Sequence, residues 1–200
     1  MTESVDYYNQ NAQAFYSGTV NVDMASLYQR FLPLLPNGGR ILDAGCGSGR
    51  DALFFKQAGF DVTAFDASEK LAEMAANLIG DTVAVLRFQA IDWVEQFDGI
   101  WACASLLHVS DDELLAVFNR LFLALKPEGV LYCSFKYGEQ KQRNKEGRIF
   151  TDMTEEAIAQ RLTQLPFHLV WESWLTEDLR PGRNEQWLNL IIRKSNTSPM

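Results

Sequence analysis

A run of three glycines at alternate positions constrains this chain of 200 residues more than any other feature. Gly45, Gly47 and Gly49 follow a short apolar run at residues 41–44, which is typical of a buried strand. Glycine adopts positive φ and has no Cβ, so the chain turns sharply there and a ligand lies close to the backbone where the next helix begins. The pattern predicts a nucleotide-type site at the end of a strand.

The spacing of the residues around these glycines narrows the ligand. A dinucleotide-binding fingerprint needs a third glycine at position 50, where this chain has Arg50. Instead, Asp43 opens a D-x-G-x-G-x-G pattern, and Asp66 closes the next apolar strand at residues 62–65. One strand-helix-strand unit separates the two acids, which positions Asp66 for ribose hydroxyls. The spacing therefore argues against a nicotinamide-dependent oxidoreductase.

Residues 38–136 resemble the class I S-adenosylmethionine-dependent methyltransferases. The resemblance rests on residues 43–49, on F-D-G-I-W-A-C at 97–103 and on L-K-P-E-G-V-L at 125–131, in the order and spacing of that family. It implies an α/β fold of one domain, a three-layer, Rossmann-like, seven-stranded and mostly parallel sheet with a final antiparallel strand. It also implies S-adenosylmethionine as the cofactor.

The resemblance assigns the cofactor site residue by residue. Asp66 would hold the ribose, the amides of residues 45–49 and Arg50 the methionine part, and the Cys103 backbone the amine end. The family commonly has an acid for adenine where this chain has Ala90, so either Asp92 or Gln89 with the loop backbone takes that role. The predicted cofactor residues are Asp43, Gly45, Cys46, Gly47, Gly49, Arg50, Asp66, Ala67, Ser68, Gln89, Ala90 and Cys103.

Apolar periodicity predicts the remaining elements and the domain limits. We expect a helical lid at residues 1–37, the methyltransferase domain at 38–195 and a tail at 196–200. Helices are expected at 6–16, 24–35, 51–58, 69–78, 112–125 and 154–165, and further strands at 83–88, 100–106, 130–135, 169–175 and 186–192.

Three residues are candidates for the catalytic site. The aromatic stripe at residues 8–16 either packs a helix on the domain or, as in similar small-molecule methyltransferases, lies over the cofactor with Tyr8 and Tyr16 beside the substrate. His108 follows the fourth strand, where an acceptor would lie and where a histidine could titrate near neutral pH. A structural role for His108, bonded to the next helix, is the alternative.

Basic residues gather in two loops that follow late strands. Lys136, Arg148, Arg180 and Arg183 are the predicted substrate-binding residues, and with Lys141, Arg143 and Lys145 they make seven of the 18 basic residues. They predict a positive mouth for an anionic substrate, since guanidinium groups bind carboxylates and phosphates in bidentate fashion. The alternative is a solvated charged loop.

Composition limits the partners. A net charge of -8 argues against binding nucleic acid through its phosphates. Three cysteines without metal-ligand spacing predict a reduced, cytoplasmic protein with no metal. The sequence shows neither a leader nor a long apolar run, so we expect no membrane span. The oligomeric state stays unassigned.

The function expected from these features is in-line methyl transfer to a small, anionic molecule. In size and layout the chain is similar to tellurite-resistance and thiopurine methyltransferases. It lacks the Asn/Asp-Pro-Pro-aromatic motif that DNA amino methyltransferases have after the fourth strand, and it lacks the Pro-Cys of base methyltransferases that use a cysteine nucleophile. The alternative is a non-catalytic module that binds S-adenosylmethionine as a sensor or partner subunit.

Overall fold

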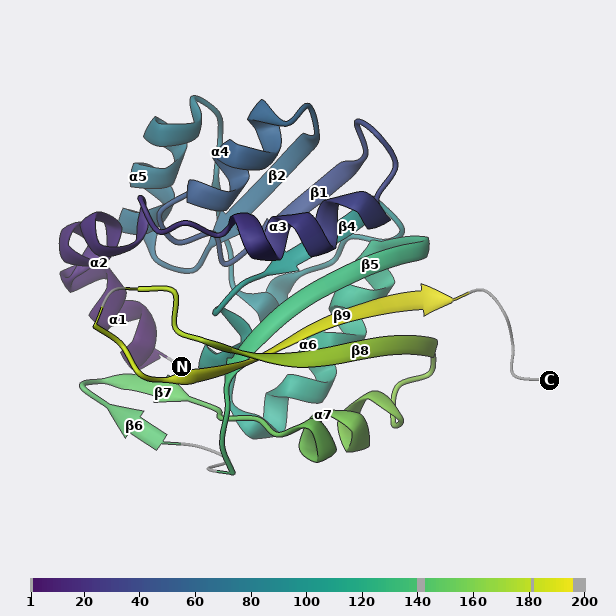
Figure 1. The fold of residues 1–200 in the computed structure, drawn as a ribbon. Coiled ribbons are helices and arrows are strands. Elements are labelled where there is room, and N and C mark those ends of the chain that lie inside the picture. The colour runs from purple at the N-terminus through teal and green to yellow at the C-terminus, as the bar shows by residue number, and fades with distance from the viewer. Residues whose placement is uncertain (1, 140–142, 181, 196–200) are drawn as a thin grey trace.

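A mixed sheet of seven strands runs through the molecule, and helices cover both of its faces (Figure 1). The computed structural model describes residues 2–139, 143–180 and 182–195. The strand order is β3-β2-β1-β4-β5-β9-β8, with β6 and β7 in a separate hairpin. The strands are β1 (Arg40–Ala44), β2 (Asp61–Asp66), β3 (Ala84–Val85), β4 (Phe97–Ala102), β5 (Leu125–Lys136), β6 (Arg143–Lys145), β7 (Arg148–Phe150), β8 (His168–Glu177) and β9 (Gln186–Ser195).

Helices fill the connections between these strands. The α-helices are α1 (Thr2–Gln10), α2 (Ala12–Thr19), α3 (Ala25–Phe31), α4 (Arg50–Gln57), α5 (Glu69–Ile79), α6 (Asp111–Ala124) and α7 (Glu155–Leu162). Three short 3₁₀ turns are η1 (Leu32–Leu34), η2 (Phe88–Ala90) and η3 (Leu106–His108). Within the described ranges, every helix is too short or too polar to cross a lipid bilayer.

Strand directions confirm the expected fold. β1 pairs in parallel with β2 and β4, and β4 pairs in parallel with β5. β9 runs antiparallel to both of its neighbours, β5 and β8. The sheet is therefore Rossmann-like and mostly parallel, with one antiparallel strand near the end of the chain. In such a sheet the loops after the parallel strands meet along one edge.

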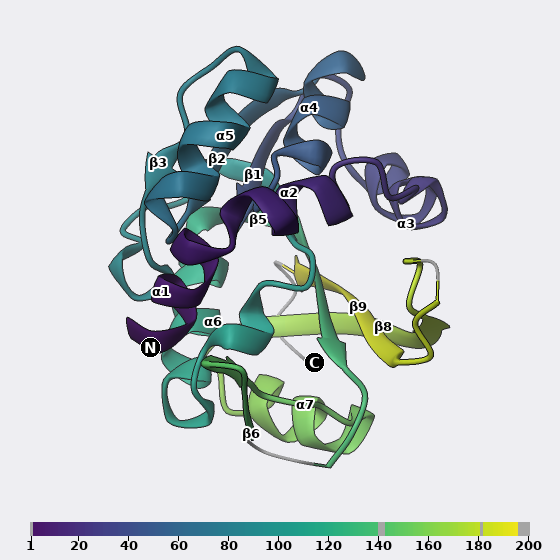
Figure 2. The same cartoon turned by 90° about the vertical axis from the view of Figure 1, so that its left-hand side faces the viewer.

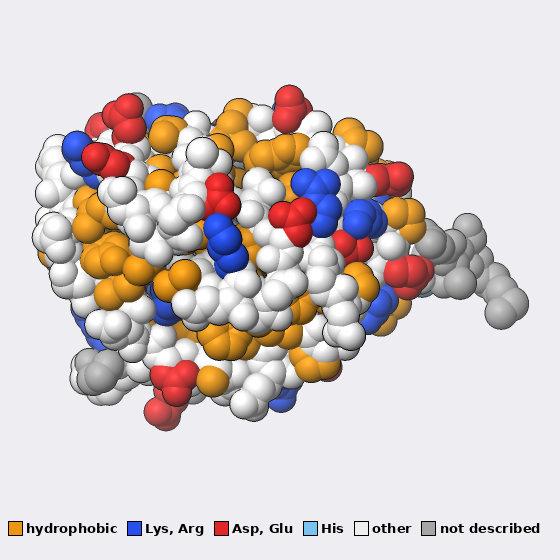
Figure 3. Space-filling model, turned by 90° about the horizontal axis from the view of Figure 1, so that it is seen from above, with side chains coloured by type: hydrophobic (Ala, Val, Ile, Leu, Met, Phe, Trp, Pro, Cys, Tyr) orange, Lys and Arg blue, Asp and Glu red, His pale blue; other side chains and the backbone are white. Residues whose placement is uncertain are grey.

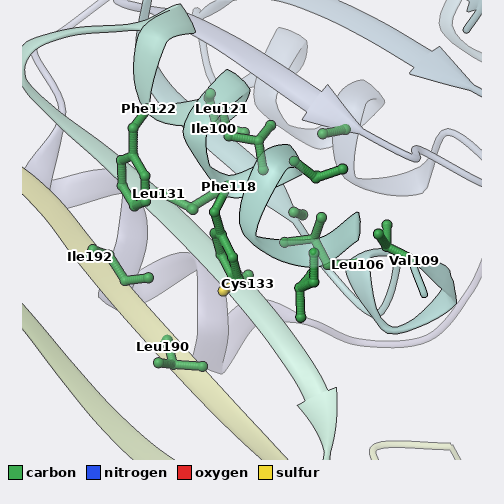
Figure 4. Packing of buried hydrophobic residues seen from close by; sticks show 14 of the residues in the cluster. Ile100, Leu106, Val109, Phe118, Leu121, Phe122, Leu131, Cys133, Leu190 and Ile192 are labelled. Atoms are coloured by element: carbon green, nitrogen blue, oxygen red, sulfur yellow. The ribbon is translucent and has the colours of Figure 1, made fainter. Parts of the chain in front are cut away.

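Two apolar cores hold the layers together. On one face of the sheet, α6 contributes Phe118 and Phe122 to a cluster with Leu131 of β5 (Figure 4). On the other face, α3 and α4 pack around Trp101, which stacks on Tyr132 with ring centroids 3.9 Å apart. Because helices cover both faces, the central strands are buried along most of their length rather than at alternate residues.

Three strands differ in extent from the expectation. The strand expected at 83–88 is only two residues long, because it is an edge strand that pairs with β2 alone. The strand expected at 100–106 starts at Phe97 and ends at Ala102, and the chain turns away at Ala104, which has a φ of 51°. β5 begins at Leu125 rather than 130, and Glu128 takes up the local irregularity with a φ of 62°.

The charged connection expected at 136–148 contains a β-hairpin. Lys145 pairs with Arg148, and the two residues between them, Glu146 and Gly147, have φ of 55° and 77°. Positive φ at both loop positions is the backbone that a tight two-residue hairpin requires. Lys141 lies outside the described residues.

The N-terminal segment forms two helices instead of the single one expected at 6–16. α1 and α2 meet at Asn11, whose φ of -111° and ψ of 18° are not helical. Figure 2 shows both helices lying across the end of the sheet. The limits proposed for a lid and a catalytic domain stay predictions, and the expected tail at 196–200 lies outside the described residues.

Candidate cofactor and substrate site

The loop between β1 and α4 has its three glycines in left-handed conformations. Their φ values are 75° at Gly45, 54° at Gly47 and 78° at Gly49. A Cβ at Gly45 would lie 2.7 Å from the Ser105 Cβ, and one at Gly47 would lie 3.0 Å from the Phe15 ring. The backbone therefore approaches its neighbours more closely than any residue with a side chain allows.

Hydrogen bonds within the protein hold this loop. The amides of Gly45 and Cys46 both donate to the Phe65 carbonyl at 2.9 Å, and the Gly49 amide donates to the Cys46 carbonyl at 2.9 Å. The Gly47 amide donates to Oδ2 of Asp66 at 2.8 Å. This differs from the expectation that the loop amides hold the methionine part of a cofactor, because four of them already donate inside the protein.

Asp66 ends β2 beside the loop. Its Oδ2 accepts from Gly47, and its Oδ1 accepts from the Ser68 amide at 2.8 Å. Burial raises the pKa of Asp66, and hydrogen bonds from the Ser68, Gly47 and Ala67 amides oppose the rise. A carboxylate accepts about four hydrogen bonds. Asp66 therefore retains acceptor capacity for a ligand hydroxyl.

A cavity of about 290 Å³ lies above the glycine loop. Loops after β1, β2, β4, β5 and β8 line it, which confirms that they share one edge of the sheet. Tyr8 of α1 and Phe15 of α2 line it, whereas Tyr16 is not among the lining residues. Of the two roles left open for the N-terminal segment, the structure has the one in which it lies over the site.

Nine of the predicted cofactor residues line the cavity. Asp43, Gly49 and Ala90 do not line it. Asp92 is exposed and away from the cavity, so Gln89 is the candidate left for an adenine edge. The nine lining residues are Gly45, Cys46, Gly47, Arg50, Asp66, Ala67, Ser68, Gln89 and Cys103.

A buried charge cluster lies beneath the loop. Arg50 donates from Nε and NH2 to both oxygens of Asp51, at 2.6 and 2.9 Å, and from NH1 to the Thr19 carbonyl at 3.1 Å. The Oδ2 of Asp43, a residue 2% exposed, has no hydrogen-bond partner among the described residues. Burial and then the charge of Asp51 raise the pKa of Asp43 well above its usual range. A cationic group nearby would relieve this carboxyl.

His108 is joined to α1 rather than to the helix that follows it. Its Nε2 lies 2.8 Å from the Tyr8 hydroxyl, and its Nδ1 lies 2.7 Å from the Ile149 carbonyl. Burial lowers the pKa of His108 to about 4, and the charges of Arg148 and Lys136 oppose protonation further. Burial therefore argues against the expectation that His108 titrates near neutral pH, because it disfavours the charged form of the ring.

Three of the four predicted substrate cations have carboxylate partners. Lys136 forms an ion pair with Glu185, and Arg180 donates from Nε to Oδ1 of Asp178 at 2.9 Å. Arg148 donates to Glu146 at 2.8 Å, and Arg183 lies exposed at the cavity rim.

The acids Asp178 and Glu185 were not among the predicted site residues. Their only signal was the mixed charge of the loop between the last two strands. They make the mouth less positive than its count of basic residues suggests. Acidic and basic side chains are likewise interspersed on the face seen in Figure 3.

Comparisons with known proteins agree with this geometry. A family model described as a methyltransferase domain matches residues 16–174. YqeM of Bacillus subtilis, whose name marks it as a methyltransferase, is 33% identical over 117 residues, or 52% of this chain and 47% of YqeM. The chain spans about half the length of the curated relatives it matches.

Solved structures share the fold. The 1,6-didemethyltoxoflavin-N1-methyltransferase of Burkholderia thailandensis, with bound 1,6-didemethyltoxoflavin and S-adenosylhomocysteine, has a TM-score of 0.76 at 24% identity, over 96% of this chain and 85% of that one. A TehB-like S-adenosylmethionine-dependent methyltransferase of Corynebacterium glutamicum has a TM-score of 0.69 at 18% identity, over 96% and 98%. With the family model matching most of its length, the chain belongs to the class I S-adenosylmethionine-dependent methyltransferase family.

Proposed function

We propose that this chain transfers a methyl group from S-adenosylmethionine to a small molecule in the cavity above the glycine loop. One observation carries the proposal: the Gly47 amide bonds Asp66 at the ends of two neighbouring parallel strands, so a side-chain-free loop and a carboxylate meet at the cavity wall. In a chain of this family, a glycine loop beside a carboxylate is the arrangement that would bind a nucleoside.

The residues at the wall suit the parts of this cofactor. Asp66 would accept from the ribose hydroxyls, and Gln89 would face the adenine edge. Arg50 and the Cys103 backbone would hold the methionine part. When bound, the cofactor supplies a sulfonium methyl group for in-line displacement.

The chain's own contribution is alignment and exclusion of water. α1 and α2 cover the cavity, so an acceptor would be held against the cofactor site without bulk solvent. His108 would position Tyr8, because a histidine with a pKa of about 4 is a poor base at neutral pH. Tyr16 has no place in this scheme because it does not line the cavity.

The acceptor is proposed to be small and to present an anionic or carbonyl-type oxygen. Arg148 supports this, since its Nε is buried and has no partner among the described residues. Lys136 and Arg180 support it less, because each already pairs with a carboxylate. All three cysteines are free thiols, which accords with the proposed cytoplasmic location.

Two measurements test the function. Titration calorimetry with S-adenosylmethionine and S-adenosylhomocysteine measures binding, and release of S-adenosylhomocysteine in the presence of a metabolite extract measures turnover. Binding without release would favour the non-catalytic module. For the acceptor, anionic compounds should be methylated faster than neutral ones. Equal rates, together with an unchanged rate after Arg180→Ala and Arg183→Ala, would exclude an anionic acceptor.

A further inference from the structure

The hydrogen-bond polarity of Tyr8 is fixed by its neighbours. A carbonyl oxygen only accepts, so the 2.7 Å contact between Ile149 and His108 puts the hydrogen of the ring on Nδ1. Nε2 then carries a lone pair, and the Tyr8 hydroxyl, 2.8 Å away, donates to it. Because its hydrogen is committed to His108, the Tyr8 oxygen can only accept from a ligand.

The backbone that fixes this polarity is itself held in place. The Ile149 amide donates to the Ser4 hydroxyl at 2.9 Å, so the residue that orients His108 is bonded to α1, the helix that carries Tyr8. Ile149 also pairs with Asn144 across the β6–β7 hairpin. The chain of hydrogen bonds runs from Tyr8 through His108 and Ile149 to Ser4, so it starts and ends on α1.

Arg148 places a donor beside this acceptor. Its guanidinium lies over the rings of Tyr7 and Phe150, with distances of 4.4 and 5.2 Å to their centroids. Its Nε is buried and has no hydrogen-bond partner among the described residues. Burial raises the pKa of Tyr8 to about 12, while the charge and a hydrogen bond of Arg148 oppose the rise, so the two groups are close.

Both side chains line the cavity that the proposed function assigns to the acceptor. The Tyr8 oxygen only accepts and has Arg148 as one donor, while the Nε of Arg148 has no partner among the described residues, so a ligand that satisfies both side chains presents a donor next to an acceptor. Leaving either unmatched in a closed site costs affinity, which is how buried polar groups discriminate between ligands.

We propose that the methyl acceptor binds through an edge with an N–H or O–H group next to a carbonyl-type or anionic oxygen. This inference rests on the proposed function. The N–H or O–H donates to the Tyr8 oxygen, and the neighbouring oxygen accepts from Arg148. Lactams and enolised diketones have such an edge. His108 is then a positioning residue, since it determines which groups Tyr8 accepts without touching the substrate.

The test uses two small probes on the protein saturated with S-adenosylhomocysteine. 2-Pyridone has the N–H beside C=O, and N-methyl-2-pyridone has the same ring without the donor. Amide shifts of the ¹⁵N-labelled protein give both affinities. We expect 2-pyridone to bind at least about tenfold more tightly. Equal affinity, or no binding of either probe, would overturn the inference.

Matched variants assign the preference to Tyr8. Tyr8→Phe should reduce the preference to within about twofold, whereas Tyr16→Phe, the same change outside the cavity, should keep it. His108→Phe frees the Tyr8 hydrogen to donate, so binding of N-methyl-2-pyridone should strengthen relative to 2-pyridone. A preference that survives Tyr8→Phe would show that the bulk of the methyl group, not the missing donor, excludes the probe, and the inference would be wrong.

A spectroscopic measurement tests the polarity without any probe. The ¹⁵N shifts of His108 should show the tautomer with hydrogen on Nδ1, and the opposite tautomer would contradict the inference. Calorimetry with S-adenosylhomocysteine separates the two proposals. If the cofactor product binds but the probes are not distinguished, only the acceptor edge is wrong. If the cofactor product does not bind, the proposed function fails first.

Discussion

The Gly47 amide donates to the Asp66 carboxylate across 2.8 Å, which joins the glycine loop after β1 to the end of β2. The same carboxylate accepts from the Ser68 amide at 2.8 Å, where α5 begins. One side chain therefore shapes the loop and also forms part of the cavity wall.

Replacing Asp66 by Ala should weaken binding of S-adenosylhomocysteine by about 1–3 kcal/mol, the scale of a lost hydrogen bond to a charged group. Titration calorimetry measures the change. Asp61→Ala is the matched control, because Asp61 lies on the same strand but is exposed and pairs with Arg40 at 3.2 Å. An unchanged affinity in the Asp66 variant would contradict its assignment to the ribose.

Gly49→Ala should destabilise the fold by about 2–4 kcal/mol, because it adds overpacking to the strain of a left-handed residue. Gly49 has a φ of 78°, and a Cβ added there would lie 2.9 Å from the Ala75 Cβ on α5. Gly38→Ala is the control, with a φ of 67° and its nearest neighbour at 3.7 Å, so it should cost only about 1–2 kcal/mol of strain. Urea denaturation gives both values, and equal losses would rule out the packing effect.

Asp51→Ala should lower the free energy of unfolding by about 3–5 kcal/mol, since removing one partner of a buried ion pair leaves the other uncompensated. Asp51 is 6% exposed and accepts from Arg50, from the Trp101 Nε1 at 2.9 Å and from the Tyr28 hydroxyl. Glu73→Ala breaks an exposed pair with Lys70 at 3.4 Å and should cost less than about 1 kcal/mol. Similar losses in denaturant titrations would refute the role of the buried cluster.

The contribution of His108 to the stability of the fold should fall as the pH drops from about 6.5 towards 4. Burial lowers the pKa of His108 to about 4, so the unfolded chain, with an ordinary histidine, binds a proton first. At pH 5 this costs about 2 kcal/mol relative to pH 7.5. His108→Phe should remove that part of the pH dependence while carboxylates titrate as before. Parallel slopes for the two proteins between pH 7.5 and 5 would disprove it.

Local sequence was enough to predict most of the strands. The glycines, the acid that ends β2 and the apolar runs are contiguous signals, whereas the seven-stranded topology was implied by the family resemblance. The Ser68 cap was equally local, because its hydroxyl accepts from the Leu71 amide three residues on, at 3.2 Å. Features that depend on a short stretch were therefore predictable.

Features that depend on contacts between distant segments were not predictable from the sequence. The lowered pKa of His108 follows from burial by a hairpin and a helix whose contact residues lie 41 and 100 positions away. The pairing of Lys136 with Glu185 spans 49 positions, so its neutralising effect on the mouth had no counterpart in local composition. The hairpin itself was missed because Glu146–Gly147 is a weaker turn signal than Asn-Gly.

The N-terminal helices are fastened around the opening of the cavity at three polar points. Ser4 bonds to Ile149, Asn9 to Ser68, and the Thr19 carbonyl to Arg50. Water can replace each of these bonds without disturbing a strand. Breaking these contacts to open the cavity would therefore leave the hydrogen bonds between the strands of the seven-stranded sheet intact.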